Sequence, residues 1–170
     1  MIRRALTEDA AAVGHIHVES WKVAYRGQLP DEYLDGLDAT RSRRAPIWQR
    51  AIDSPAQRVF VAVRDGIVVG FVSVGAPDDK ALAADVGELY AIYVHPNAWD
   101  IGAGRALMSS AVHALRELGY AGAVLWVLGS NERARRFYER AGWSTDGATK
   151  VEERPGVALH EVRYARRLIE

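Results

Sequence analysis

Two glycines, Gly102 and Gly104, lie where a predicted strand ends and a predicted helix begins. The N-terminus of a helix presents unpaired N–H groups and about half a positive charge, so it can hold phosphate oxygens. Glycine lets this backbone approach a ligand because no Cβ stands in the way. A tight turn that needs a positive φ is the simpler interpretation, and two glycines alone do not decide between the two.

Three kinds of phosphate-binding turn compete for this position. A P-loop needs Lys and then Ser or Thr after its glycines, whereas Gly104 is followed by Arg105 and Ala106. The dinucleotide fingerprint of an oxidoreductase needs a third Gly or Ala where Leu107 stands, and it normally lies near the start of the fold. The interpretation that remains is the diphosphate of coenzyme A.

The composition limits what else the chain could bind. Its 170 residues fit one domain, residues 1–170, and 49% of them are hydrophobic, which is enough to build a core. Lys and Arg total 22 and Asp and Glu total 22, so no net charge attracts nucleic acid or an acidic membrane. The sequence has no cysteine, no histidine spacing typical of a metal site and no membrane-spanning apolar run. We therefore expect a soluble cytoplasmic protein with no metal and no nucleic-acid or membrane partner.

Changes of hydrophobic period predict the elements that must position the glycine turn. Helices are predicted from Thr7, as N-cap, to Trp21, and over residues 30–37, 41–52, 105–118 and 131–140. Strands are predicted over residues 2–6, 59–63, 67–74, 88–94, 123–128, 143–151 and 158–166. A hairpin turn at Asp65 and Gly66 joins the second and third strands. This order predicts a mixed α/β fold with helices on both faces of the sheet.

Two stretches in the second half of the chain resemble the paired motifs of the GNAT acetyltransferases. Residues 88–108 read ELYAIYVHPNAWDIGAGRALM and resemble the coenzyme A-binding motif, a strand followed by Gln/Arg-x-x-Gly-x-Gly/Ala. Residues 131–143 read NERARRFYERAGW and resemble the motif that follows it in the family. Residues 2–34 are similar to the N-terminal region of many bacterial members, so the resemblance spans nearly the whole chain.

The resemblance implies a GNAT-like fold and an acetyl transfer. The sheet would be mostly antiparallel, with two central strands splayed around the cofactor. The protein would transfer an acetyl group from acetyl-coenzyme A (acetyl-CoA) to a primary amine of a small molecule or protein by direct attack. The cofactor-binding residues would be Ile92, Tyr93, Val94, Ile101, Gly102, Ala103, Gly104, Arg105, Ala106, Asn131, Arg133, Ala134 and Tyr138. Ile92, Tyr93 and Val94 would act mainly through their backbones.

Two side chains match catalytic positions of the family. Tyr138 matches the tyrosine that faces the sulfur, and a phenol with a pKa of about 10 can protonate a departing thiolate. Glu88 matches a position where some members carry a glutamate base, which a charged amine would need. A purely structural interpretation stays open for each residue. Tyr138 could be a core tyrosine on an amphipathic helix, and Glu88 could be a strand-end carboxylate in water. Asn131 could likewise hold the pantetheine arm, cap a helix, or do both.

The acceptor site would lie beside the N-terminal helices. The residues predicted to line it are Trp21, Tyr25, Gln28, Tyr33 and Tyr90. Aromatic side chains could stack on a ring or hold a cation, and core packing is the alternative for Trp21. Nothing in this region identifies the acceptor.

The chain departs from the family pattern in the glycine turn. Trp99 stands at the usual Gln/Arg position, and Asp100 would put a negative charge near the diphosphate, so we expect a weaker cofactor affinity. A non-catalytic acyl-CoA sensor would keep the glycines without needing Tyr138 or Glu88, and it is the alternative function. By analogy with relatives, we expect a homodimer.

Overall fold

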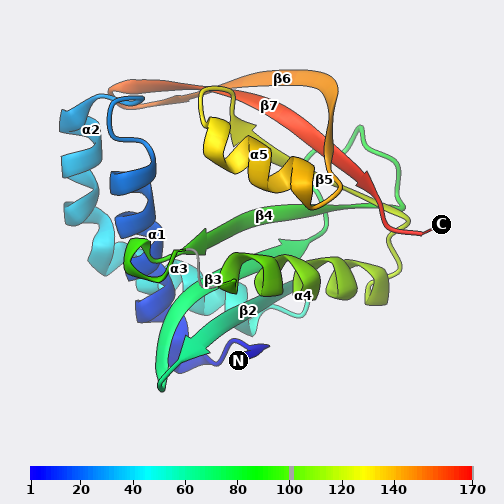
Figure 1. Cartoon of the computed structure of the whole chain (residues 1–170), viewed down its shortest axis with the longest axis horizontal. Helices are drawn as coiled ribbons and strands as arrows, with labels where there is room; N and C mark the ends of the chain where they lie inside the picture. Colours follow the sequence, from blue (N-terminus) through cyan, green and yellow to red (C-terminus); the bar gives the residue numbers. More distant parts are fainter. Residues whose placement is uncertain (100–101, 170) are drawn as a thin grey trace.

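A computed structural model describes residues 1–99 and 102–169 of the chain (Figure 1). The strands are β1 (Ile2–Arg4), β2 (Gln57–Arg64), β3 (Ile67–Gly75), β4 (Val86–Val94), β5 (Gly122–Leu128), β6 (Ser144–Arg154) and β7 (Val157–Arg167). The helices are α1 (Ala10–Ala24), α2 (Asp31–Gly36), α3 (Arg41–Asp53), α4 (Ala103–Glu117) and α5 (Glu132–Arg140). Short 3₁₀ turns cover Thr7–Asp9, Leu37–Thr40 and Pro96–Ala98. None of the helices described is long and apolar enough to cross a membrane.

The strands form one sheet in the order β1-β2-β3-β4-β5-β7-β6. Only the junction between β4 and β5 is parallel; the other described strand pairs are antiparallel. Asp65 and Gly66, both at positive φ, make the tight turn between β2 and β3, as the sequence predicts. The predicted mixed, mostly antiparallel sheet is confirmed.

Helices cover both faces of the sheet because side chains of a strand alternate between the faces (Figure 1). On one face α4 and α5 pack on the central strands, with Leu107 and Leu115 fully buried against residues such as Leu125. On the other face α1 and α3 pack on β2 and β3, where Ile16 and Phe71 are buried. The two layers leave the middle of the sheet between α1 and α5 as the place where a cavity forms.

The predicted splay of the central strands is confirmed, and a β-bulge explains it. β4 and β5 pair only from Val86 to Glu88. Just beyond this segment, Ser73 pairs with Ala91 and Val74 with Leu89, so Tyr90 is an extra residue in β4. A bulge bends its strand and increases the local twist. β4 therefore turns away from β5 beyond the bulge, and backbone groups on the facing edges are left without a strand partner.

The prediction that Thr7 caps the first helix is wrong. Its hydroxyl instead donates to the Asp53 carboxylate (2.6 Å), which ties the start of α1 to the end of α3. The capping role falls to Asp9, whose Oδ2 accepts the Leu6 N–H (2.7 Å) and pairs with Arg3 (2.6 Å). α1 also continues three residues past Trp21, to Ala24, and at its end the Tyr25 N–H donates to the Trp21 carbonyl (3.1 Å).

Candidate active site

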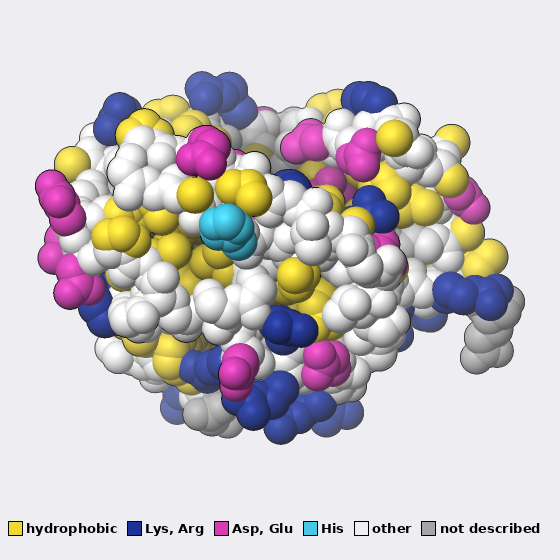
Figure 2. All heavy atoms as spheres, turned by 90° about the horizontal axis from the view of Figure 1, so that it is seen from above, with side chains coloured by type: hydrophobic (Ala, Val, Ile, Leu, Met, Phe, Trp, Pro, Cys, Tyr) yellow, Lys and Arg dark blue, Asp and Glu magenta, His cyan; other side chains and the backbone are white. Residues whose placement is uncertain are grey.

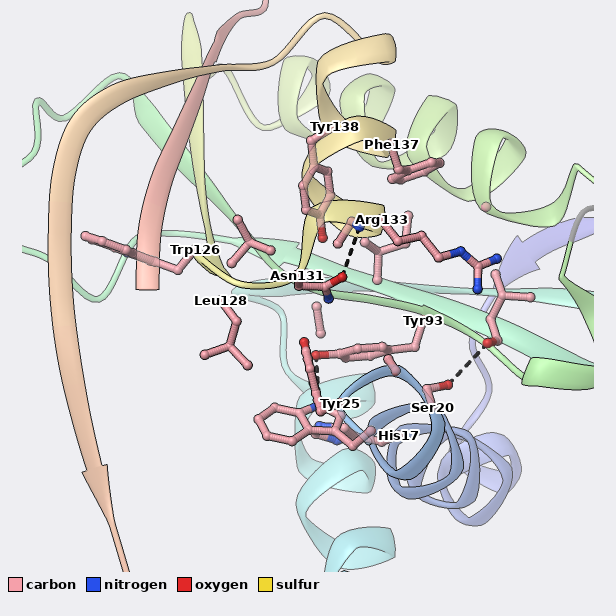
Figure 3. A pocket seen from close by; sticks show the side chains of 18 of the residues that line it. His17, Ser20, Tyr25, Tyr93, Trp126, Leu128, Asn131, Arg133, Phe137 and Tyr138 are labelled. Carbon is pink, nitrogen blue, oxygen red and sulfur yellow. Dashed lines mark hydrogen bonds between the residues drawn. The ribbon is translucent and has the colours of Figure 1, made fainter. Parts of the chain in front are cut away.

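A cavity of about 880 Å³ fills the space between the splayed strands (Figure 3). Its walls come from α1, from β4 and β5, from the first turn of α4 and from the first turns of α5. β6 and β7 contribute its far end through Lys150, Glu152, Arg154 and Glu161. The two ends differ in chemistry: a helix N-terminus and glycines on one side, paired charges on the other.

The glycine turn forms the N-terminus of α4. Gly102 has a φ of 82°, a left-handed conformation that glycine adopts without steric cost. The helix then starts at Ala103, and the Ala106 N–H donates to the Gly102 carbonyl (3.1 Å). The N–H groups of residues 103–105 precede this first intrahelical bond, so helix geometry gives them no acceptor. They are available to an anion, whereas the Ala106 backbone is already used. Asp100 and Ile101 lie outside the described residues.

Gly104 has a helical backbone, so it needs no positive φ. A Cβ placed on it would lie 3.5 Å from the Phe137 ring, an ordinary van der Waals contact. The fold therefore tolerates alanine at this position. The absence of a side chain matters instead to whatever approaches from the cavity, which Gly104 lines. This observation favours a ligand that contacts the backbone at the start of α4.

Trp99 links this turn to the start of α5. Its indole N–H donates to the Val94 carbonyl (2.8 Å), and the Arg133 guanidinium lies 3.5 Å from the centre of its ring. Figure 2 shows basic side chains interleaved with acidic ones at the lower edge of the face that it presents. The fixed positive charge of Arg133 beside the turn can attract the phosphates of an anionic ligand. Arg105 is exposed at the first turn of α4, and Ala134 lines the cavity in the first turn of α5.

The backbone of β4 presents alternate residues to the cavity. The His95 N–H donates to the Val69 carbonyl (2.8 Å), and Tyr93 pairs with Phe71 on β3. Backbone groups alternate in direction along an antiparallel strand, so those of Ile92 and Val94 face away from β3, toward the splay. Ile92 can therefore bind a ligand through its backbone, and Val94 through its N–H, because the Val94 carbonyl already accepts from Trp99 and from the Ser20 hydroxyl (3.2 Å). Tyr93 cannot bind a ligand in this way, because its backbone pairs with β3 and only its side chain reaches the cavity.

Tyr138 and Asn131 face the middle of the cavity from α5. The Tyr138 side chain is buried, and its hydroxyl end points toward Asn131 (Figure 3). Burial raises the pKa of this phenol above its ordinary value, so it keeps its proton at physiological pH. Asn131 is the N-cap of α5, as predicted, since its Oδ1 accepts the Ala134 N–H (3.1 Å). Its amide nitrogen hydrogen-bonds the Tyr25 hydroxyl and has a second N–H for another partner.

An aromatic network joins α1 to the cofactor side of the cavity. The Trp21 indole N–H donates to the Tyr93 hydroxyl (2.8 Å), and Tyr93 and Asn131 both hydrogen-bond the Tyr25 hydroxyl. Burial raises the pKa of both tyrosines. Trp21 and Tyr25 are thus both core residues and cavity-lining residues.

His17, which the sequence did not single out, lies beneath this network. Its ring stacks on Tyr93 with 5.2 Å between centroids, and its Nδ1 lies 3.1 Å from an Arg44 nitrogen. Burial, with the charges of Arg44 and Arg154, lowers the pKa of His17 to about 3. The imidazole is therefore neutral and unavailable as a cationic group at physiological pH.

We expect acid to destabilise the fold through His17. The unfolded chain takes up a proton near the ordinary histidine pKa of about 6.5 and the folded protein does not, so stability is present above that pH and falls as the pH drops toward 3. The loss approaches about 1.4 kcal/mol per pH unit in this window. Urea unfolding at pH 7, 6, 5 and 4 would measure it. A His17→Gln variant should show a shallower slope, and equal slopes would contradict this assignment.

Glu88 and Tyr90 lie at the narrow end of the splay. Glu88 is buried, 9% exposed, and its Oε2 accepts the Asp78 N–H (3.2 Å). Burial is the main cause that raises the pKa of Glu88, and the charge of Asp78 adds to it. The Tyr90 hydroxyl donates to the Ala76 carbonyl, and burial raises its pKa. Tyr90 therefore lines the cavity with its ring, while its hydroxyl is held by the loop before β4.

Two of the predicted acceptor-site residues have other partners. The Gln28 Nε2 donates to the Ala24 carbonyl (3.0 Å), and its Oε1 accepts the Ser130 hydroxyl (2.9 Å). Gln28 lines the cavity as predicted for the acceptor site, and its amide also tethers the end of α1 to the loop before α5. Tyr33 packs with the core of this region, and its hydroxyl accepts from Arg154 (3.4 Å). It is not among the described residues that line the cavity.

Sequence reasoning missed most of the strand residues in the cavity. Those with polar or aromatic side chains are Trp126, Lys150, Glu152, Arg154 and Glu161. A signal existed for three of them, because alternate positions 150, 152 and 154 are charged and residues two apart share one face of a strand. Within residues 1–99 and 102–169, no group of His, Asp and Glu is arranged to hold a metal ion.

Comparisons with known proteins agree with this geometry. The profile of the Acetyltransferase (GNAT) family matches residues 13–143. An uncharacterized N-acetyltransferase of Bacillus subtilis, YuaI, is 33% identical over 131 residues, covering 76% of this chain and 72% of YuaI. A mycothiol acetyltransferase of Thermomonospora curvata is 34% identical over 115 residues, covering 68% of this chain. The match covers only 35% of that longer protein.

Solved structures share the fold. PaiA N-acetyltransferase from Thermoplasma acidophilum, in complex with coenzyme A, superposes with a TM-score of 0.74 at 22% identity, covering 98% of each chain. YncA of Salmonella typhimurium, with acetyl-CoA, gives a TM-score of 0.69 at 21% identity, covering 100% of this chain and 94% of yncA. The chain belongs to the GNAT acetyltransferase family, whose cofactor is acetyl-CoA. This membership does not favour the non-catalytic sensor.

Proposed function

We propose that the protein transfers an acetyl group from acetyl-CoA to a primary amine. The observation that carries the proposal is the continuity of one cavity, from the free N–H groups of α4 to the Tyr138 hydroxyl. Acetyl-CoA supplies the thioester, whose carbonyl is attacked by the amine. The residues described fit this ligand, because Gly104 leaves room at the helix N-terminus and the splay exposes the backbone of β4.

The chain's own groups would perform three tasks. The N–H groups of residues 103–105, with Arg105 and Arg133 nearby, would bind the diphosphate. Backbone groups of Ile92 and Val94, with Asn131, would hold the pantetheine arm and polarise the thioester carbonyl. Tyr138 would give its proton to the departing sulfur, because a neutral phenol is the correct protonation state for this step.

A thiol-release assay with acetyl-CoA and a panel of primary amines tests the proposal. We expect amine-dependent release of free thiol that saturates with acetyl-CoA. Binding of acetyl-CoA without turnover on any amine would favour a binding module instead. No saturable binding at low salt would remove the acyl-CoA site itself. Sedimentation of the same sample would test the predicted homodimer.

We further propose that Glu88 accepts the amine proton through water. Its raised pKa makes it a better base than an ordinary glutamate near neutral pH. Glu88→Gln should lower kcat/KM for an alkylamine by about 100-fold and remove the acid limb of its pH profile. The variant should keep its Tm at pH 8 or raise it, since the folded-state pKa is raised and the wild type loses stability as the pH rises through it. An unaltered pH profile would exclude Glu88 from the mechanism.

A further inference from the structure

The far end of the cavity holds a carboxylate whose charge is poorly matched. Glu161 on β7 pairs in register with Leu128 on β5 and with Lys150 on β6. Its Oε2 atom is buried, and no described residue gives that atom a hydrogen bond. The ammonium of Lys150 lies 3.5 Å away, longer than the roughly 2.8 Å of a charge-assisted hydrogen bond. The Glu161 side chain is 15% exposed, so its carboxylate is largely withdrawn from water with one loose ion pair, and burial of charge costs free energy unless it is paired.

Other carboxylates near this end are already paired. The Glu152 Oε1 accepts both the Nε and the Nη2 of Arg154, at 3.1 and 3.0 Å. Glu88 accepts the Asp78 N–H at the opposite, narrow end of the splay. Along the sheet, Glu88 is in register with Val124 and Glu161 with Leu128. Four residues of strand correspond to roughly 13 Å, so the two carboxylates serve different parts of the cavity.

The charge of Glu161 acts on the aromatic network in the middle of the cavity. Burial and, in addition, the charge of Glu161 raise the pKa of Tyr25, whose hydroxyl is hydrogen-bonded by Asn131. Asn131 adjoins Tyr138 in the cavity (Figure 3). Three residues after Leu128, Asn131 starts the helix that carries Tyr138. A group bound to the Glu161 carboxylate would therefore sit within the same cavity as the acetyl-transfer chemistry.

The charged groups that face Glu161 are Lys150, Glu152 and Arg154 on β6, with the Tyr25 phenol at the end of α1. Arg154 is held by Glu152, and the pKa of Glu161 is raised chiefly by burial. Lys150 is the most exposed of these groups, with a side chain 43% exposed, and Trp126, whose ring centre lies 4.5 Å from the ammonium, offers that ammonium a cation–π partner besides Glu161. It can turn to solvent and leave Glu161 to another cation.

We propose that Glu161 binds an ammonium group of the acceptor and that Lys150 occupies this site when no acceptor is bound. The inference rests on the proposed amine acetyltransferase function and adds the chemical class of the acceptor. The ammonium has two sources: a second amino group on the acceptor, or the reacting amine itself, which would then not use Glu88 as its base because the two carboxylates lie roughly 13 Å apart. The ion pair with Lys150 stabilises the Glu161 carboxylate in the absence of an acceptor, although its buried Oε2 atom accepts no hydrogen bond.

Binding of two probes to the coenzyme A-bound protein tests the proposal without turnover. The probes are butylamine and 1,4-diaminobutane, followed by calorimetry or by the fluorescence of Trp21 and Trp126, which line the cavity. Glu161→Gln should weaken binding by at least about tenfold, as expected for a lost buried charge pair. Lys150→Met should strengthen it, because the competing cation is gone. A merely structural Glu161–Lys150 pair predicts no gain from Lys150→Met.

The two probes distinguish the two sources of the ammonium. The control variant and the thiol-release assay distinguish failure of this inference from failure of the proposed function. Equal weakening for both probes identifies the reacting amine as the ammonium, and weakening for the diamine alone identifies a second amino group. Glu153→Gln, an exposed neighbour outside the described cavity lining, is the matched control and should change neither. Unchanged binding of both probes by Glu161→Gln overturns the inference. Failure of the proposed function would appear separately, as absence of thiol release by the wild type.

Discussion

Replacing Tyr138 with Phe should lower kcat by about 100-fold or more while leaving the KM for acetyl-CoA nearly unchanged. The hydroxyl acts only when the sulfur departs, so its loss removes an interaction of the transition state rather than of binding. The phenyl ring keeps the packing of α5 on the core, where Tyr138 contacts Phe137 and Tyr164. Steady-state thiol release over pH 6 to 9 is the measurement. Burial keeps the wild-type phenol protonated over this range, so its titration should not shape the profile.

Tyr164→Phe is the matched control for this variant. Tyr164 is a buried tyrosine beside Tyr138, but its hydroxyl donates to Glu139 (2.8 Å) and accepts from Arg135 (3.0 Å). Removing that hydroxyl should cost about 1 kcal/mol of stability and leave kcat unchanged. If Tyr138→Phe turned over as fast as the wild type, Tyr138 would be a packing residue and the thiolate would be protonated by solvent.

Replacing Gly104 with Ala should raise the Kd for acetyl-CoA only about threefold, without unfolding the protein, because the family motif itself admits Ala at this position. The new methyl group would stand beside the N–H groups that we propose bind the diphosphate, where it lengthens a hydrogen bond and does not remove one. In the fold itself, the Cβ makes only ordinary contact with Phe137, and Ala favours a helix over Gly. Titration calorimetry with acetyl-CoA measures the first effect and thermal unfolding the second.

Gly36→Ala provides a control outside the cavity. Gly36 also has a helical backbone, and nothing lies within 4 Å of the position that a Cβ would take there. This change should leave both the Kd and the Tm essentially unaltered. An unchanged Kd in Gly104→Ala would show that the ligand does not approach the backbone here, and the glycine pair would then serve the turn alone.

Contiguous features were predictable from the sequence because short-range rules govern them. The turn at Asp65 and Gly66, the strand–glycine–helix junction and the cap at Asn131 each depend on residues within a few positions. The sheet and its splay followed from the family resemblance, and the bulge at Tyr90 supplies the physical cause. Thr7 shows the limit of such rules. Its hydroxyl donates to a side chain 46 residues away, and this tertiary contact replaces the helix cap that the local rule predicts.

The composition of the cavity was decided by strand register. Glu161 faces the cavity because β7 pairs with β5 at Leu128, and a shift of one residue would have turned it to the opposite face. Gln28 lines the cavity, and the fold also brings Ser130 to its amide oxygen across 102 residues of sequence. The sequence by itself determined which backbone segments are suited to bind acetyl-CoA, since these depend on local turns and helix ends. Only the tertiary structure decided which side chains surround the proposed acceptor site, because pairing between distant strands sets their direction.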